Sequence, residues 1–230
     1  MSIVLCYHAV SRKWNDPLAI PPKQLERQVA AALRWQRGRV HVTFDDGFRS
    51  VLGALPVLER LGVPATVFVC TDFVGRILDL PPLESIATRH RDELATLSWD
   101  ELRKAAARGL DVGSHTRRHL DLRGLSDEAL RDELAGSREE IEGRLGRPCR
   151  HLAYPYGQSD ARVQVAAERA GYDAAFGLVG AGKLGGRFGI PRVDPSRRDG
   201  VLRIGFKTSR LWPVVLPPLR RLHGLGARLT

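Results

Sequence analysis

Short apolar runs rich in Val, Ile, Leu and Phe alternate along the chain with longer segments of mixed apolar and polar residues. The short runs predict β-strands, and the longer segments predict amphipathic helices whose apolar side chains share one face. The predicted strands cover residues 2–8, 39–46, 64–73, 110–115, 150–157, 172–179, 188–194 and 201–206. The predicted helices cover residues 22–35, 50–62, 98–109, 126–146 and 160–171.

Alternation of strands and helices predicts parallel βαβ units, and about seven such repeats favour a closed barrel over an open sheet. The chain has 230 residues, a length that suits one α/β barrel domain with a sizeable core. We therefore expect an α/β fold with one domain over residues 1–205 and a tail over residues 206–230. The linker-like residues 72–97 predict an insertion on the barrel rim.

Charge changes this picture only near the C-terminus. The net charge is +10, but residues 197–230 contain eight Lys or Arg and one acid, so this segment alone carries +7. Its mixture of Arg with Leu, Trp and Val is compatible with contact with an anionic membrane or with a glycan-assembly enzyme. A solvated basic tail is the alternative. Nucleic acid is not an expected partner, because no recognised nucleic-acid-binding module accompanies the charge.

The three cysteines and the N-terminal residues bear on the cellular compartment. Cys6, Cys70 and Cys149 are scattered and form no CxxC pair, which predicts buried free thiols. The first residues lack a basic region, a long apolar stretch and a small-residue cleavage site. No run approaches the ~18 apolar residues that span a bilayer. The sequence as given predicts a cytoplasmic protein, with the inner face of the membrane as one setting.

Chemistry in α/β barrels lies where strands end, and two adjacent carboxylates, Asp45 and Asp46, end the second predicted strand. His115 ends the fourth predicted strand, and His119 follows four residues later. On a helical turn this spacing places both imidazoles on one face, able to share a cation. Two histidines and one carboxylate leave coordination positions open, as catalytic metal sites require. The second carboxylate then remains free as a general base. The alternative is an Asp pair that only caps the turn before Gly47.

Three motifs in order, "TFDDG", "SHTRRH" and "YPYG", resemble the first three motifs of the polysaccharide deacetylase (NodB-homology) family. The resemblance extends from "IVLCYHAV" to "IPRV", most of the chain. It implies a distorted (β/α)7 barrel of the NodB-homology type. It also implies a metal-dependent hydrolase that removes N-acetyl groups from GlcNAc-containing glycans.

The resemblance also assigns roles to individual residues. Asp46, His115 and His119 match the metal ligands, with Zn²⁺ the expected ion and Co²⁺, Ni²⁺ or Fe²⁺ as alternatives. Asp45 matches the general base. Tyr156 matches the residue whose backbone N–H stabilises the oxyanion.

The chain departs from the family pattern in three places. Ala153 replaces the usual Arg of the third motif, and both the late His that serves as general acid and the usual Asp-Trp motif are missing. His8 ends the first predicted strand and could act as the replacement acid or contact substrate; the alternative is a packed histidine on the rim. Arg192 ends a late strand and could orient Asp45; the alternative is a solvated arginine.

These patterns predict a divalent-metal-dependent carbohydrate N-deacetylase acting on an N-acetylated polysaccharide or a lipid-linked glycan intermediate. One alternative is hydrolysis of another small amide, such as a cyclic imide, on the same fold. A second alternative is a non-catalytic glycan- or membrane-binding protein, which the missing Arg and His would favour.

Overall fold

The computed structural model describes residues 2–14, 17–80, 83 and 89–209, and seven parallel strands form its central sheet. The sheet order is β1-β4-β5-β6-β7-β8-β9, which is also the order of these strands in the chain. Each of these strands lies within an apolar run that predicted a strand. Their bounds are β1 Ile3–Tyr7, β4 Val40–Phe44, β5 Ala65–Val69, β6 Asp111–Ser114, β7 His151–Ala153, β8 Ala174–Leu178 and β9 Ile190–Arg192.

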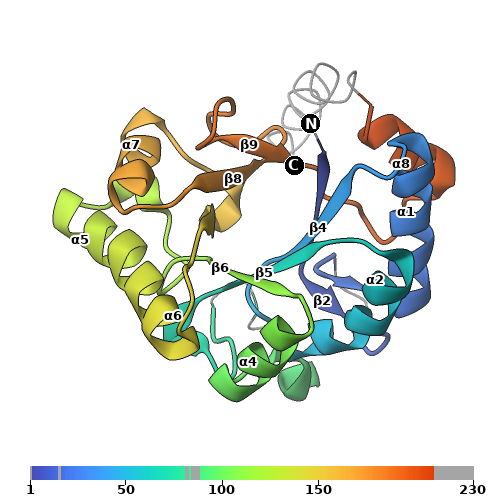
Figure 1. Ribbon diagram of the computed structural model, residues 1–230, viewed down its shortest axis with the longest axis horizontal. Helices are drawn as coiled ribbons and strands as arrows, with labels where there is room; N and C mark the ends of the chain where they lie inside the picture. Colours follow the sequence, from blue (N-terminus) through green and yellow to red (C-terminus); the bar gives the residue numbers. More distant parts are fainter. Residues whose placement is uncertain (1, 15–16, 81–82, 84–88, 210–230) are drawn as a thin grey trace, which may run out of the picture.

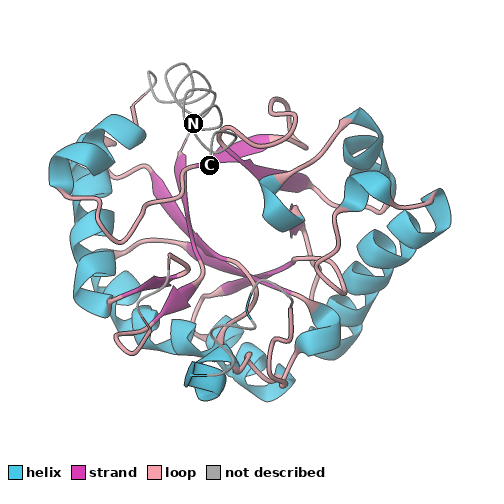
Figure 2. Cartoon of the chain, turned by 180° about the vertical axis from the view of Figure 1, so that it is seen from behind, coloured by secondary structure: helices cyan, strands magenta, loops and turns pink. Residues whose placement is uncertain are grey.

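The sheet curls until its first and last strands meet. A parallel bridge joins Leu5 and Val193, and the N–H of Cys6 donates to the carbonyl of Val193 over 2.7 Å. Figure 1 shows the strands as a central ring with helices on the outside, and Figure 2 shows the same ring from behind. The expected single-domain (β/α)7-type barrel is therefore confirmed.

Capping residues mark several of the helix ends. Ser98 and Glu101 form a reciprocal capping box at the start of α4, and Gly62 and Gly146 end α2 and α6 in the left-handed conformation. The helix bounds are α1 Pro22–Trp35, α2 Leu55–Leu61, α4 Trp99–Ala107, α5 Asp127–Arg131, α6 Ser137–Leu145, α7 Ala161–Arg169 and α8 Val201–Lys207. A π-helical segment, Asp132–Gly136, joins α5 to α6, so the predicted helix 126–146 is one helical body with a local change of winding.

The predicted strand 201–206 is wrong, because these residues form helix α8. Helix α8 packs against α1 (Figure 1), and a Cβ on Gly205 would lie 2.6 Å from the Trp35 ring. The Lys207 ammonium reaches back 2.6 Å to the buried Asp199 carboxylate. These tertiary contacts override the strand-like apolar pattern. Helix α8 also crosses the predicted boundary at residue 205, and residues 210–230 of the predicted tail lie outside the described residues.

Additional short elements surround the barrel. Strands β2 (Ala9–Val10) and β3 (Ala19–Ile20) form a separate two-stranded sheet, and an isolated bridge joins Ile77 to Ala95 within the predicted insertion. The three cysteines are buried and free, as predicted. Among the residues described, no helix combines the length and the apolar character needed to cross a membrane.

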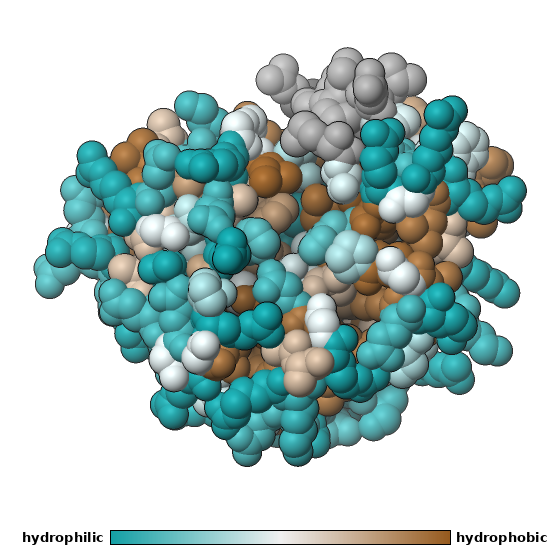
Figure 3. Space-filling model, in the orientation of Figure 1, coloured by the Kyte–Doolittle hydropathy of each residue, from teal (hydrophilic) through white to brown (hydrophobic). Residues whose placement is uncertain are grey.

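The core lies between the barrel wall and the surrounding helices, and a smaller apolar cluster fills the barrel interior. That interior cluster contains Val4, Phe68, Ala153 and Phe176. The Arg192 guanidinium lies 5.5 Å from the Phe68 ring centroid. This charged group therefore packs on the apolar cluster, on the side of the carboxyl ends of the strands. Figure 3 shows one face of the molecule, where hydrophilic side chains surround smaller areas of hydrophobic ones.

Candidate metal and catalytic centre

The adjacent carboxylates Asp45 and Asp46 follow directly after β4 and contact different side chains. Asp46 and Gly47 both have left-handed backbones, with φ of 68° and 70°, so the chain turns sharply after Asp45. A Cβ at residue 47 would lie 3.0 Å from Cγ1 of Val69, which explains glycine there. The turn gives the two neighbouring carboxylates different surroundings although both are buried.

Asp45 is held by a buried ion pair with Arg192 from β9. The Arg192 Nη1 and Nη2 donate to Oδ1 and Oδ2 of Asp45 over 2.6 and 2.8 Å, and the Cys6 thiol donates to Oδ2 over 3.3 Å. Burial, the largest influence, favours the neutral acid, but Arg192 and the nearby imidazoles of His115 and His8 hold the pKa of Asp45 well below its ordinary value. Asp45 is therefore an ionised, tightly oriented carboxylate.

Asp46 faces two imidazoles instead of a guanidinium. Its Oδ1 lies 3.6 Å from Nε2 of His115 and 3.5 Å from Nε2 of His119. Bond lengths of about 2.0–2.2 Å to a tetrahedral Zn²⁺ separate neighbouring ligand atoms by roughly 3.3–3.6 Å. The spacing of these three side chains therefore matches that of ligands sharing one ion.

The path between the two histidines differs from the expected helical turn. Residues 115–119 form an irregular loop in which Thr116 and His119 are left-handed, with φ of 69° and 59°. The loop nevertheless brings the rings together, with centroids 4.8 Å apart. The Thr116 hydroxyl accepts from the N–H of His119 over 3.2 Å. Each left-handed non-glycine residue costs about 1–3 kcal/mol, so neighbouring contacts must hold this loop.

The surroundings of His115 and His119 favour neutral imidazole rings. Nδ1 of His115 donates to the carbonyl of Ala153 over 2.8 Å, which leaves the lone pair of Nε2 directed at Asp46. Burial lowers the pKa of His115 to about 3 and also lowers the pKa of His119. Both rings are therefore neutral near pH 7. Ala153, which departs from the family pattern, contributes through its backbone.

The residues present fit a divalent cation. Burial raises the pKa of Asp46 to about 6, and the charge of Asp45 adds to this effect against the opposing charges of His8 and Arg192. Among the described residues, Oδ1 of Asp46 is buried without a hydrogen-bond partner. An isolated buried carboxylate is unfavourable unless an opposite charge compensates it. A cation bound by Asp46, His115 and His119, whose ligand atoms all lie within 4.8 Å, would supply that charge.

A pocket of about 210 Å³ opens above this centre, and its lining includes both carboxylates, His115, His119, His8 and Tyr156. His8 follows β1 and is partly exposed, and ligand atoms of His8 and Asp45 lie within 4.8 Å. The Tyr156 ring packs 4.7 Å from that of His119. Tyr156 is also left-handed, with φ of 59°. All seven candidate site residues therefore gather at one end of the barrel, with Arg192 beneath Asp45.

Two residues of the site were missed by the sequence reasoning. Cys6 donates to Asp45; its only signal was its place in the first strand, two residues before His8. Glu133 is fully buried and accepts from the backbone between His115 and His119. A Glu within a charged amphipathic helix carries no sequence signal of this contact.

Comparison with known proteins identifies the family of this chain. A sequence model of the family described as "Polysaccharide deacetylase" matches residues 34–175. A Bacillus subtilis (strain 168) protein named "Putative polysaccharide deacetylase YxkH" is 26% identical over an alignment of 188 residues, and the match covers 74% of this chain and 61% of that protein. The chain thus spans about three fifths of the length of this relative.

Solved structures show the same barrel. The crystal structure of BC0361, a polysaccharide deacetylase from Bacillus cereus, superposes with a TM-score of 0.70 at 24% identity, covering 90% of this chain and 69% of that one. The Streptococcus pyogenes deacetylase PplD, in complex with acetate, gives a TM-score of 0.69 at 18% identity, covering 90% and 98%. The matched segment contains Asp45, Asp46, His115, His119 and Tyr156, and it makes up more than half of the chain. This chain is a member of the polysaccharide deacetylase family.

Proposed function

We propose that this chain is a divalent-metal-dependent hydrolase that removes N-acetyl groups from a GlcNAc-containing glycan. The observation that carries the proposal is the contrast between the two neighbouring carboxylates. Asp45 is paired with Arg192, whereas Oδ1 of Asp46 faces two neutral imidazoles without a hydrogen-bond partner among the described residues. The first carboxylate suits proton transfer, and the second suits cation binding.

Asp46, His115 and His119 would hold the cation, which the proposal takes as Zn²⁺, with Co²⁺, Ni²⁺ or Fe²⁺ as alternatives. When bound, such an ion lowers the pKa of a coordinated water towards about 7 and polarises the acetyl carbonyl. The protein residues supply the remaining functions: they orient the substrate, move protons and exclude bulk water.

Asp45 accepts one proton from the attacking water as the water oxygen bonds to the acetyl carbon. Its depressed pKa keeps it ionised before each turnover, and the bidentate contact with Arg192 fixes its direction. The backbone N–H of Tyr156 donates to the oxyanion that forms on the former carbonyl; one such donor contributes about 2.7–4 kcal/mol. The C–N bond then breaks as His8 gives a proton to the amine nitrogen, releasing acetate and the free amino sugar.

The test is acetate release from a series of GlcNAc oligomers by Zn²⁺-loaded wild type, Asp45→Asn and His8→Ala. We expect Asp45→Asn to retain the ion but lose at least 100-fold in rate, since general base catalysis contributes about 10²–10⁴-fold. A comparable loss in His8→Ala, with binding unchanged, supports its role as the acid. Wild-type protein that binds the ion but releases no acetate would refute the proposal.

The apolar wall of the pocket favours a second candidate, a small amide substrate. Four leucines, Leu18, Leu80, Leu83 and Leu178, line the pocket, whose volume of about 210 Å³ is below the roughly 300–1,000 Å³ of typical ligand sites. Turnover of a cyclic imide or of monomeric GlcNAc, with none on longer oligomers, would select this candidate. The proposed partner of residues 206–230 is an anionic membrane or a glycan-assembly enzyme; residues 210–230 of that tail are outside the described part of the chain.

A further inference from the structure

Glu133 is a fully buried carboxylate outside the predicted catalytic set. It lies in the π-helical segment Asp132–Gly136 between α5 and α6. A π-segment inserts one extra residue into the helix, so the side chains that follow turn by about 100° relative to a regular α-helix. Such segments are frequent at functional sites. This one places the Glu133 carboxylate against the loop that joins His115 and His119.

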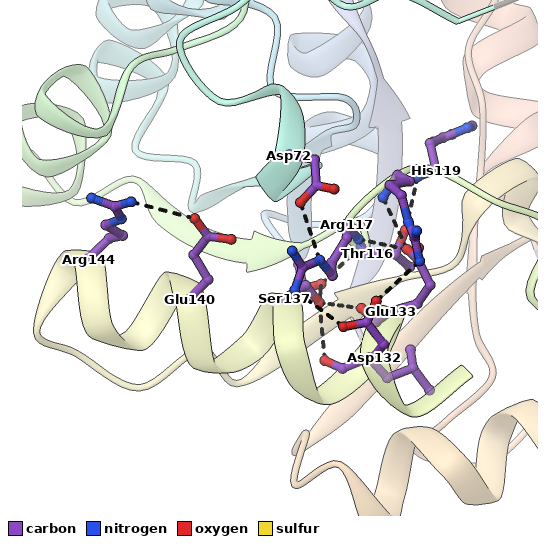
Figure 4. A network of polar contacts seen from close by, with 12 residues as sticks. Asp72, Thr116, Arg117, His119, Asp132, Glu133, Ser137, Glu140 and Arg144 are labelled. Atoms are coloured by element: carbon purple, nitrogen blue, oxygen red, sulfur yellow. Dashed lines mark hydrogen bonds and ion pairs between the residues drawn. The ribbon is translucent and has the colours of Figure 1, made fainter. Parts of the chain in front are cut away.

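Every hydrogen bond that the structure gives the Glu133 carboxylate comes from that loop. Oε2 accepts from the backbone N–H of Arg117 over 2.9 Å and from that of Arg118 over 3.0 Å. Oε1 accepts from Nε of Arg118 over 2.6 Å. Figure 4 shows Glu133 together with Thr116, Arg117 and His119 of the loop. One carboxylate therefore binds two consecutive main-chain amides between His115 and His119.

The loop needs such an anchor, because its backbone is unfavourable on its own. Thr116 and His119 both adopt the left-handed conformation. This conformation is rare for a β-branched residue such as Thr116. The other side of the loop is held by weaker contacts: the N–H of Asp72 donates to the carbonyl of Arg117 over 3.2 Å. The Arg117 Nε also contacts the Asp72 carboxylate over 3.2 Å. Within the described part of the chain, Glu133 is the buried carboxylate that accepts from the main-chain amides of this loop.

We infer that Glu133 is a positioning residue for the cation site. It fixes the main chain between His115 and His119 so that both Nε2 atoms face Oδ1 of Asp46. This inference rests on the proposed use of these three residues as cation ligands. A carboxylate that served only as the ion-pair partner of Arg118 would have no effect on the cation.

The experiment measures Co²⁺ binding and the visible absorption spectrum of the bound ion in chelator-stripped, full-length protein. Supporting groups of this kind change metal affinity by about 10–100-fold, so we expect Glu133→Ala to weaken Co²⁺ binding by that factor and to alter the spectrum. Glu133→Gln keeps an oxygen for the two amides, but it loses the charge and the acceptor for the Arg118 Nε–H. We expect it to restore affinity to within about threefold of wild type and to preserve the spectrum. If Glu133→Ala does not fold, Glu133→Asp tests the same point, because its shorter side chain withdraws from the amides.

Two controls separate positioning from general destabilisation. Ile141→Ala removes a buried side chain from α6, and Glu140→Ala removes a surface pair with Arg144 on the same helix. Both should leave Co²⁺ affinity and spectrum unchanged. The inference is overturned if Glu133→Ala binds Co²⁺ like wild type, or if Ile141→Ala weakens binding equally.

The proposed function can fail separately. Wild-type protein that binds no Co²⁺ removes the cation site and the inference together. Wild-type protein that binds Co²⁺, loses it in Glu133→Ala and still hydrolyses no acetylated substrate leaves the inference standing and refutes the proposed reaction.

Discussion

Removal of the Arg192 guanidinium should destabilise the barrel far more than removal of an arginine from the surface. Arg192 is 0% and Asp45 3% exposed, and two hydrogen bonds of 2.6 and 2.8 Å join them. Breaking a buried pair by removing one partner costs about 3–5 kcal/mol, because a buried charge remains uncompensated. We therefore expect Arg192→Met to lower the free energy of unfolding by about that amount, or the melting temperature by roughly 6–20 °C.

The assay is urea unfolding at pH 7 with a chelator present, because a bound ion would itself shift stability. The double variant Arg192→Met with Asp45→Asn should recover at least half of the loss, since the charge at position 45 is removed together with its partner. Arg60→Met is a matched control: it breaks an exposed pair with Glu26 of similar length, 2.7 Å, and should cost less than about 1 kcal/mol. Equal effects of Arg192→Met and Arg60→Met would refute the reasoning.

The pH dependence gives a second test of the same pair. In wild type the folded pKa of Asp45 lies below its unfolded value of about 3.9. Its contribution is therefore constant above pH 5 and is lost only as pH falls through the folded pKa. In Arg192→Met, burial acts without the guanidinium, so the folded pKa should rise above the unfolded value. The stability deficit of the variant should then grow from pH 4.5 to pH 7; a deficit that stays constant would contradict this assignment.

Further predictions concern the ion and the helix contacts. Asp46→Asn should reduce bound ion, measured by elemental mass spectrometry, to background, while Asp45→Asn keeps about one ion per chain; equal loss in both would contradict the division of roles. Gly205→Ala should lower the free energy of unfolding by about 1–3 kcal/mol, because its Cβ would lie 2.6 Å from the Trp35 ring. Gly143→Ala, at an open position of α6, should raise the free energy of unfolding by up to about 1 kcal/mol. Urea unfolding of both variants measures these changes, and a change of the opposite sign in either variant would contradict the prediction.

The seven barrel strands could be predicted because each is a short apolar run buried against helices. The run "VLRIGF" has similar composition but forms α8. What decides its conformation is the fit of Gly205 against Trp35 and the pair between Lys207 and Asp199. The local pattern of apolar and polar residues does not indicate either contact, since both depend on residues that only the folded chain brings together.

The same distinction holds within the candidate site. Asp45, Asp46, His115 and His119 could be found because their motifs are local and lie at strand ends. The contact between Arg192 and Asp45 could be named only as a hypothesis, because 147 residues separate the two. Glu133 could not be found at all: its role depends on a π-helical segment, whose extra residue has no signature in the pattern of apolar positions.

The closure of β1 against β9 has a consequence for how the protein is made. At about 5–20 residues per second, a ribosome needs roughly 7–30 s to add the 147 residues that separate Asp45 from Arg192. Throughout that interval a compact nascent chain would have to bury the Asp45 carboxylate without Arg192. Because an unpaired buried charge is unfavourable, we expect the growing barrel to stay open until β9 has been added. The contact between Asp45 and Arg192 therefore forms only when nearly the whole domain has been synthesised.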